Sequence, residues 1–110
     1  MEITIKEMNR VDLIEVAGRI DSSNAEELGE ALKQRVDDGR RNLVVDLAGV
    51  EYMSSAGLRE LVATLKQVKQ GSGDLRLCNP SERVAEVLEL AGLDSVFEIY
   101  DDQVTAVGSF

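Results

Sequence analysis

Residues 43–47, Leu-Val-Val-Asp-Leu, form a short apolar run rich in branched side chains. A run of this kind is typical of a strand covered on both faces, whereas a strand with one face in water alternates apolar and polar residues. The run therefore predicts a central strand in a sheet. A short turn should follow it and lead into Ser54 and Ser55, which can begin a helix.

The residues before this run predict a hairpin and a helix. Residues 2–8 and 11–18 have the character of strands joined by a tight turn. Ser23 and Glu26 have the spacing of a capping box, and apolar residues then recur at helical spacing until about Asp38. An antiparallel pair of strands followed by a first helix should therefore open the fold.

The second half of the chain continues this alternation. A helix should begin at the serine pair and end at the Gly-Ser-Gly sequence of residues 71–73. Asn79 and Pro80 are of the types preferred at the N-cap and first position of a third helix, and Gly92 suits its left-handed C-terminal cap. The other predicted elements are strands at 75–78 and 97–100 and a short helix at 104–107.

Strands that alternate with helices predict an α/β fold. We expect a mixed, mostly parallel sheet of four to five strands, opened by the N-terminal hairpin, with helices packed on it. The length of 110 residues fits one domain that covers residues 1–110. Polar residues should gather beyond the carboxyl ends of the strands, namely Asp21 with Ser22, residues 51–55, and Asn79.

The charge of the chain argues against a nucleic-acid partner. Twelve Lys and Arg residues against 21 Asp and Glu give a net charge of −9, which repels phosphate backbones. The N-terminus lacks a basic segment before a long apolar run, and no stretch is long enough to span a bilayer. We therefore expect a cytoplasmic protein without direct membrane insertion. The single cysteine, Cys78, should fill core space without a catalytic role.

The residue inventory gives little support for an enzyme. The sequence contains no histidine, which excludes a Ser-His-Asp triad and histidine-ligated zinc. It also contains neither common nucleotide-binding glycine motif. We therefore expect no catalytic residue, no cofactor and no metal. Asp46 can be explained as a carboxylate that accepts hydrogen bonds from the backbone of the following turn, and Asp21 as a cap or turn residue unless it faces Ser55.

The serine pair is the strongest candidate for a functional site. With Ser54 as the N-cap, its hydroxyl should accept a first-turn N–H, and Met53 and Leu58 should form a hydrophobic staple. Ser55 should then project its hydroxyl into solvent at the positive helix end, where a phosphate is stabilised. Gly57 suits a place where another backbone approaches closely. From spacing alone, a simple helix start explains these residues better than any chemistry.

A resemblance to a known family adds to this interpretation. Residues 45–47, Val-Asp-Leu, and 50–58, Val-Glu-Tyr-Met-Ser-Ser-Ala-Gly-Leu, resemble the signature of STAS domains, especially bacterial anti-sigma factor antagonists. Residues 18–21, 79–80 and 91–93 are similar to that family as well, so the resemblance covers the whole chain. It implies the STAS fold.

The resemblance also implies a partner switch controlled by phosphorylation. In the family, a serine kinase with an ATP-binding fold, which doubles as the anti-sigma factor, phosphorylates the serine at the position of Ser55. The unphosphorylated antagonist binds this kinase and releases the sigma factor, phosphorylation abolishes binding, and a PP2C-type serine phosphatase restores the active form. The resemblance implies that Asp21 and Asp46 line the acceptor site. The other residues that we expect around the acceptor or in partner binding are Ser22, Met53, Ala56, Gly57, Leu58 and Arg59.

Ser54 departs from the family pattern, because the best-known antagonists have aspartate before the acceptor. Serine also caps helices, but the change removes a negative charge and adds a second hydroxyl, which makes Ser54 an alternative acceptor. STAS modules with two serines here also answer to other partners. The alternative function is therefore a STAS subunit that is never phosphorylated and stabilises a larger complex, such as a lipid-transport ATPase. The sequence leaves the oligomeric state open.

Overall fold

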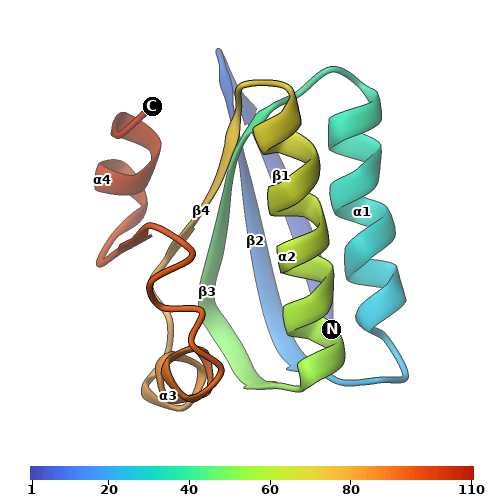
Figure 1. Cartoon of the computed structure of the whole chain (residues 1–110), viewed down its shortest axis with the longest axis vertical. Coiled ribbons are helices and arrows are strands. Elements are labelled where there is room, and N and C mark those ends of the chain that lie inside the picture. The colour runs from blue at the N-terminus through green and yellow to red at the C-terminus, as the bar shows by residue number, and fades with distance from the viewer.

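The computed structural model describes residues 1–110 and contains five strands and four helices (Figure 1). Their bounds are β1 Glu2–Met8, β2 Val11–Ile20, α1 Ala25–Asp37, β3 Asn42–Met53, α2 Ser55–Gln70, β4 Asp74–Cys78, α3 Glu82–Leu90, β5 Ile99–Tyr100 and α4 Gln103–Gly108. Strands and helices follow one another in the predicted order, and the fold is α/β.

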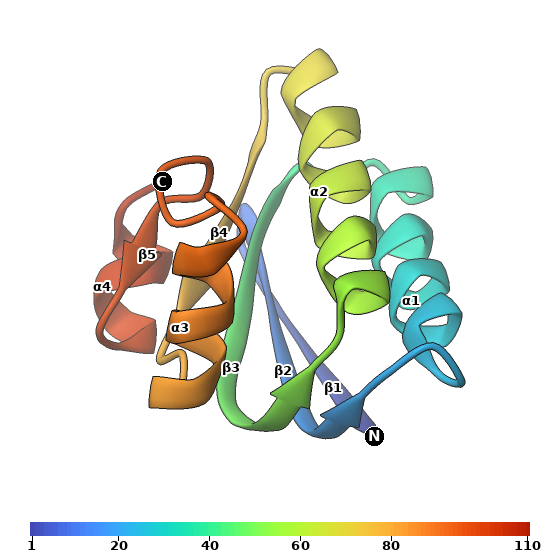
Figure 2. The same cartoon turned by 60° about the horizontal axis from the view of Figure 1, so that its bottom comes forward.

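The five strands form one mixed sheet in the order β1-β2-β3-β4-β5. β1 pairs antiparallel with β2, and all other neighbours are parallel. β3 is the central strand, which confirms the prediction made from residues 43–47. α1, α2 and α3 cover one face of the sheet, and the short α4 covers part of the other (Figures 1 and 2).

The side chains of β3 explain the continuous apolar run. Leu43, Val45 and Leu47 belong to the main core beneath α1, α2 and α3. Val44 points to the other face, where it packs in a smaller cluster with Ala106 of α4. Full burial of a Val or Leu side chain contributes roughly 1.5–3 kcal/mol. Successive apolar residues are therefore favoured in β3, because helices cover both of its faces.

β3 is longer than predicted. A short turn is predicted between the apolar run and the serine pair, but the strand continues to Met53, which pairs with Ile20 of β2. From Asp12 to Ile20, β2 advances eight residues, while β3 advances ten from Leu43 to Met53, so two register shifts lie between them. Such bulges bend a strand without ending its pairing. On β3 the two shifts fall between Asp46 and Gly49 and between Val50 and Tyr52.

The first helix begins differently from the predicted capping box. Ser23 donates its backbone N–H (2.9 Å) and its hydroxyl (2.5 Å) to Oδ1 of Asp21. Asn24 is the N-cap residue, and its side chain accepts from the N–H of Asp21 and donates to the carbonyl of Arg19. The predicted Ser23–Glu26 capping box is wrong because Asp21 forms a local turn that engages the serine.

The third helix begins two residues later than predicted. Ser81 is its N-cap, and the Ser81 hydroxyl accepts the N–H of Val84 at 3.3 Å. Asn79, the predicted cap, has a left-handed backbone with φ of 53° and donates its N–H to Tyr100 of β5. Because serine and asparagine are comparable N-caps, the pairing of Asn79 with β5 decides between them. The left-handed cap at Gly92, with φ of 72°, is confirmed.

The C-terminal elements differ slightly from their predicted bounds. Of the predicted strand at 97–100, only Ile99–Tyr100 pairs, because Phe97 turns into the main core and is 4% exposed. The short helix predicted at 104–107 is confirmed as α4, Gln103–Gly108. None of the four helices combines the length and the apolar character that a bilayer crossing requires.

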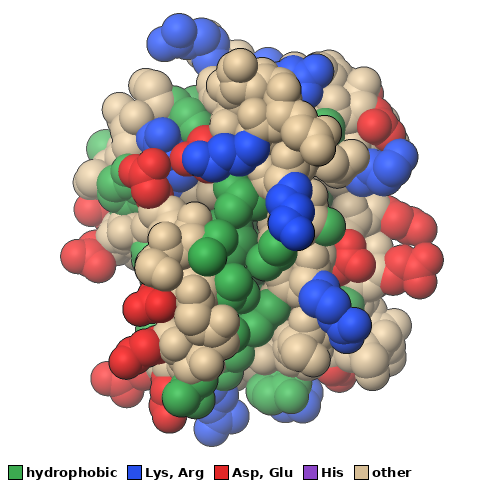
Figure 3. Space-filling model, in the orientation of Figure 1, with side chains coloured by type: hydrophobic (Ala, Val, Ile, Leu, Met, Phe, Trp, Pro, Cys, Tyr) green, Lys and Arg blue, Asp and Glu red, His purple; other side chains and the backbone are tan.

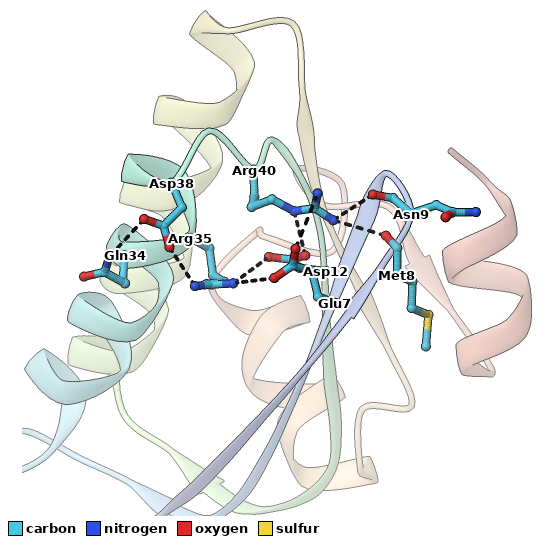
Figure 4. Close-up of polar contacts among 8 residues, drawn as sticks. All are labelled: Glu7, Met8, Asn9, Asp12, Gln34, Arg35, Asp38 and Arg40. Atoms are coloured by element: carbon cyan, nitrogen blue, oxygen red, sulfur yellow. Dashed lines mark hydrogen bonds and ion pairs between the residues drawn. The ribbon is translucent and has the colours of Figure 1, made fainter.

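A buried carboxylate links the β1–β2 hairpin to the segment between α1 and β3. Asp12 of β2 is fully buried and accepts a hydrogen bond from Nε of Arg40 at 2.8 Å (Figure 4). Arg40 also donates to the carbonyls of Met8 and Asn9 in the hairpin turn. Nη1 of Arg35 on α1 lies 3.6 Å from the other carboxylate oxygen of Asp12. These contacts fix the hairpin against α1.

Candidate functional site

The ends of β2 and β3 bring two polar loops together. The N–H of Ser54 donates to the carbonyl of Ile20 at 2.9 Å, although 34 residues separate them in the sequence. The loop that follows β2 therefore lies beside the start of α2 (Figure 2), and Asp21 and Ser22 are the first residues of this loop. The prediction that these two loops share one edge of the sheet is confirmed.

Ser54 occupies the predicted N-cap position of α2 but does not cap the helix with its side chain. Its backbone is extended, and its carbonyl accepts the N–H of Leu58 at 3.1 Å. Its hydroxyl oxygen is buried and has no hydrogen-bond partner. The expected side-chain cap bond is therefore wrong. The orientation also matters for chemistry, because a buried hydroxyl is poorly accessible to an enzyme that would modify it.

Ser55 is the first residue of α2, and its side chain is exposed. The unpaired N–H groups of the first turn give this end of the helix a partial positive charge. No acidic residue lies in that turn, and exposed Arg59 follows one helical turn later on the same side. An accessible hydroxyl thus lies at a helix end whose partial positive charge favours an added negative charge.

Close packing beneath the helix start fixes the position of Ser55. A Cβ atom on Gly57 would lie 2.7 Å from Cγ2 of Ile20 and 3.0 Å from Cγ of Met53. Gly57 therefore permits a close approach, as expected, but to side chains rather than to another backbone. Met53 and Leu58 both belong to the main core, as the predicted hydrophobic staple requires. Ala56 packs at the edge of the same core.

The carboxylate of Asp21 is directed into its own turn. The pKa of Asp21 is lowered, first by the hydroxyl of Ser23 and then by the Ser23 N–H, both of which donate to it. The group is therefore negatively charged at neutral pH and adds a negative charge beside the serine pair. Ser22 is exposed and lines a hollow of about 260 Å³ together with Ala56 and Arg59. Asp21 and Ser22 thus border the start of α2.

Asp46 does not belong to this site. It precedes Met53, the last residue of β3, by seven residues, which corresponds to roughly 20 Å of extended strand. Its Oδ1 accepts the N–H of Ala48 at 2.9 Å, and its Oδ2 accepts from the side-chain amide of Gln103 on α4. The prediction that Asp46 lines the acceptor site is wrong, because β3 is long. Asn79 is also distant, since β4 ends opposite Asp46.

An open groove of about 630 Å³ runs from Ser55 along α2 towards the end of α3. Figure 3 shows a strip of hydrophobic side chains between α2 and α3, with basic side chains along the α2 side of the strip. The groove is lined by Ser55, Leu58, Arg59, Glu60, Val62, Ala63, Lys66, Ala91 and Leu93. An apolar surface that begins at the exposed serine is suited to a protein partner.

Sequence reasoning missed the far half of this groove. Leu58, Leu61, Val62, Leu65 and Val68 recur at helical spacing and form an apolar stripe along α2 that is wider than the sheet covers, so Val62 is only half-buried. The width of this apolar stripe was the sequence signal that could have predicted an apolar surface on α2. Ala91 and Leu93 directly follow α3, and only the packing of α3 beside α2 brings them to the groove.

The remaining candidate groups show no reactive arrangement. Cys78 is fully buried beneath α4, and this burial raises the pKa of its thiol to about 12, with Asp46 contributing. The thiol is therefore protonated at neutral pH and packs as an apolar group. No group of three or more Asp, Glu or Cys side chains is arranged to hold a metal ion.

Comparison with known proteins identifies the class to which this fold and site belong. The model of the STAS domain family matches residues 2–106, so the chain belongs to the STAS domain family. BtrV of Bordetella bronchiseptica is 36% identical over 110 residues, which cover all of this chain and 95% of that protein. The anti-sigma-B factor antagonist of Staphylococcus aureus is 34% identical over 86 residues, which cover 78% of this chain and 80% of that protein. Within the STAS family, the chain thus groups with the anti-sigma factor antagonists.

Solved structures agree with this assignment. An anti-sigma factor antagonist from Mycobacterium paratuberculosis is 28% identical, with a TM-score of 0.89 over 98% of this chain and 92% of that one. SpoIIAA in its unphosphorylated form has a TM-score of 0.85 at 18% identity, over 96% of this chain and 93% of that one. Phosphorylated SpoIIAA of Bacillus gives 0.78 at 16% identity, over 98% of each chain. At these identities, the SpoIIAA structures support the fold alone.

Proposed function

We propose that this protein is a cytoplasmic anti-sigma factor antagonist, acting as one domain over residues 1–110, and that phosphorylation of Ser55 switches its partner. The observation that carries the proposal is the exposed Ser55 hydroxyl at the N-terminus of α2 and at one end of an apolar groove. Its role is binding and release of a protein rather than catalysis. The names of its relatives supply the class of partner, an anti-sigma factor.

The two serines differ in a way that favours Ser55 as the acceptor. A kinase must bring its bound nucleotide in line with the attacking oxygen. The Ser55 side chain is exposed, whereas the hydroxyl oxygen of Ser54 is buried. The geometry therefore supports Ser55 and argues against Ser54 as an alternative acceptor.

In the unphosphorylated state, the proposed partner is an anti-sigma factor that is also a serine kinase with an ATP-binding fold. Its apolar side chains fill the groove between α2 and α3, where the half-buried Val62 and Leu93 supply apolar contact area. Arg59 and Lys66, both exposed on α2, provide contacts for acidic groups at the rim. Formation of this complex releases the sigma factor.

Phosphorylation reverses the interaction through charge. A phosphoserine carries about 1.5 to 2 negative charges at neutral pH. The free protein tolerates this charge, because it lies in water at the positive end of α2 with Arg59 nearby. In the complex, the phosphate has to be desolvated at the mouth of an apolar groove and close to Asp21. The partner is therefore excluded with little refolding, and a PP2C-type serine phosphatase restores binding.

A protein of the same fold is known in two phosphorylation states. SpoIIAA, whose fold is similar to that of this chain, has been solved both unphosphorylated and phosphorylated. The fold therefore accommodates both states in that protein. We extend this behaviour to Ser55.

The test begins with affinity capture by wild type, Ser55→Ala, Ser54→Ala and Ser55→Asp from extracts of the source organism, followed by mass spectrometry. Wild type, Ser55→Ala and Ser54→Ala should retain a kinase-like anti-sigma factor, whereas Ser55→Asp should not. The captured kinase, once purified, should phosphorylate wild type and Ser54→Ala with ATP but not Ser55→Ala. The Ser54→Ala protein is the matched control, because it removes the neighbouring hydroxyl.

Two outcomes contradict the proposal. Stoichiometric phosphorylation of Ser55→Ala would show that another residue is the acceptor. Retention of transporter subunits by wild type and Ser55→Asp alike, with no phosphorylation, would favour the structural subunit of a larger complex such as a lipid-transport ATPase.

A further inference from the structure

β1 leaves a long strand edge without a partner. It forms one border of the sheet and pairs only with β2, so half of its backbone N–H and C=O groups face away from the sheet. Six of its seven residues are exposed. The opposite border, β5, has only two residues. An unpaired edge of seven residues is a template for another strand unless the protein blocks it.

The two faces of β1 have different chemistry. Ile3 and Ile5 pair with Val16 and Ile14, which lie in the main core, so they point to the face that carries α1 to α3. The alternate residues Glu2, Thr4 and Lys6 point to the opposite face of the sheet. Ile5 remains 38% exposed, although it lies on the core side of the sheet. The edge therefore offers apolar residues on one face and charged residues on the other.

We infer that β1 is a self-complementary edge at which two copies of this chain pair antiparallel, with Thr4 on the two-fold axis. In this register, Glu2 of each copy faces Lys6 of the other, and Ile3 faces Ile5. Both faces match at once, because opposite charges meet on one face and apolar side chains meet on the other. Ile5 of each copy is covered by Ile3 of the other.

Other registers do not give this match. Pairing centred on Ile5 places Ile3 opposite Glu7 and Glu2 opposite Met8. Pairing centred between Thr4 and Ile5 places Glu2 opposite Glu7. It also puts the helix-covered faces of the two copies on opposite sides of the combined sheet. Because like charges and apolar–charged contacts are unfavourable across strands, the register centred on Thr4 is preferred.

The charged residues of β1 favour pairing with a second copy rather than blocking of the strand edge. Edge strands are commonly blocked by lysine, whose charge repels an incoming strand. Here Nζ of Lys6 lies 3.3 Å from the Glu15 carboxylate of β2, and the second copy adds Glu2 on its other side. Lys6 would thus lie between two carboxylates and would help to bind the second copy.

The dimer is weak and leaves the Ser55 site open. Five residue pairs bury less area than the roughly 1,200–2,000 Å² of a stable interface, so association is expected only at high protein concentration. The groove lies between α2 and α3, which contact β3 and β4, whereas β1 is at the far border of the sheet. Dimerisation through β1 therefore neither requires nor prevents the switch proposed at Ser55.

The test is a set of charge reversals followed by sedimentation over a wide concentration range. Wild type should show a reversible monomer–dimer equilibrium. When Glu2→Lys or Lys6→Glu is tested alone, like charges face each other at both 2–6 pairs of the dimer. Each variant should therefore weaken dimerisation about 10-fold or more. An equimolar mixture of the two variants restores opposite charges at both positions and should associate as a heterodimer. Glu86→Lys, an exposed reversal on α3, is the control and should dimerise like wild type.

A cross-linking experiment checks the register. In the inferred pairing, the two Thr4 Cα atoms lie about 4.5–5.5 Å apart, which a disulfide can span. Thr4→Cys should therefore form a covalent dimer on oxidation, whereas Glu2→Cys should not, since its copies are about 13 Å apart. Cys78 is buried and does not compete.

Several results would overturn the inference. These are a wild type that remains monomeric at all concentrations, dimers of Glu2→Lys and Lys6→Glu as strong as wild type, or cross-linking of Glu2→Cys in preference to Thr4→Cys. Lys6→Glu also removes the ion pair with Glu15, so its folding is checked by circular dichroism. Glu2→Lys carries the test by itself if Lys6→Glu fails to fold.

Discussion

The N–H of Ser54 donates to the carbonyl of Ile20 at 2.9 Å, which joins the last residue of β2 to the residue that precedes α2. This bond places the Asp21–Ser22 loop beside the start of the helix. It also uses the backbone of Ser54 in sheet pairing, while the Ser54 hydroxyl is left buried and without a partner. Ser55, one residue later, is exposed.

Ser54→Ala should change stability little. Its hydroxyl makes no hydrogen bond, so its removal should shift the free energy of unfolding by no more than about 0.5 kcal/mol, in either direction. Ser81→Ala is the matched comparison, because the Ser81 hydroxyl accepts from Val84 and donates to the carbonyl of Val50. It should cost about 1 kcal/mol. Urea unfolding of both variants measures the difference, and equal losses would indicate that Ser54 caps α2 in solution.

Gly57→Ala should destabilise the protein although alanine favours helices. The added Cβ meets the branched side chain of Ile20 at 2.7 Å, and overpacking a buried contact costs about 1–3 kcal/mol. At Gly29 of α1 the same Cβ meets only the flexible carboxylate end of Glu60. Gly29→Ala should therefore be neutral or stabilising, by up to about 1 kcal/mol. Thermal unfolding distinguishes the two, and a stabilised Gly57→Ala would contradict the packing argument.

Low pH should weaken the contact of α4 with the sheet. The pKa of Glu15 is lowered, first because the amide of Gln103 donates to its carboxylate and then because Lys6 lies beside it. A lowered pKa in the folded state stabilises the fold above the ordinary value of 4.5, and this stabilisation is lost as the pH falls through the folded pKa. Hydrogen exchange of the α4 amides should therefore quicken, relative to the intrinsic rate, as the pH falls below 4.5.

Gln103→Ala tests the cause of this pH dependence. Loss of the amide donor should move the pKa of Glu15 upward, towards its ordinary value, in an NMR titration of the side-chain carboxyl groups. The lowered pKa of Asp21 depends on Ser23 and should not change, which makes it an internal control. An unchanged Glu15 pKa would assign the shift to Lys6 instead.

Asp12→Ala should be strongly destabilising. Asp12 is fully buried and bonds to Arg40. Removal of one partner from a buried ion pair costs 3–5 kcal/mol in typical cases, and we expect about 2–4 kcal/mol here because the arginine can turn towards water. Glu7→Ala removes a 62% exposed partner of Arg35 and should cost no more than about 1 kcal/mol. Denaturant unfolding compares them, and equal effects would contradict a central role of Asp12.

The local patterns of the sequence determined the order of the elements and the position of the serine pair. The apolar run at 43–47 predicted the central strand because burial on both faces favours apolar side chains at successive positions. Helical periodicity and capping residues placed Ser55 at a helix start, because these signals act within one or two turns. The family resemblance of residues 45–58 then turned a possible anion site into a candidate phosphorylation site.

Only the tertiary structure decided what surrounds Ser55. The pairing of Ile20 with Met53 extends β3, and this extension carries Asp46 away from the serine pair and leaves the Ser54 hydroxyl without the expected bond. The placement of α3 beside α2 completes the groove. Such features depend on contacts between residues far apart in the chain, whose free energies outweigh local capping preferences of about 1 kcal/mol. Local sequence patterns carry no signal for those contacts.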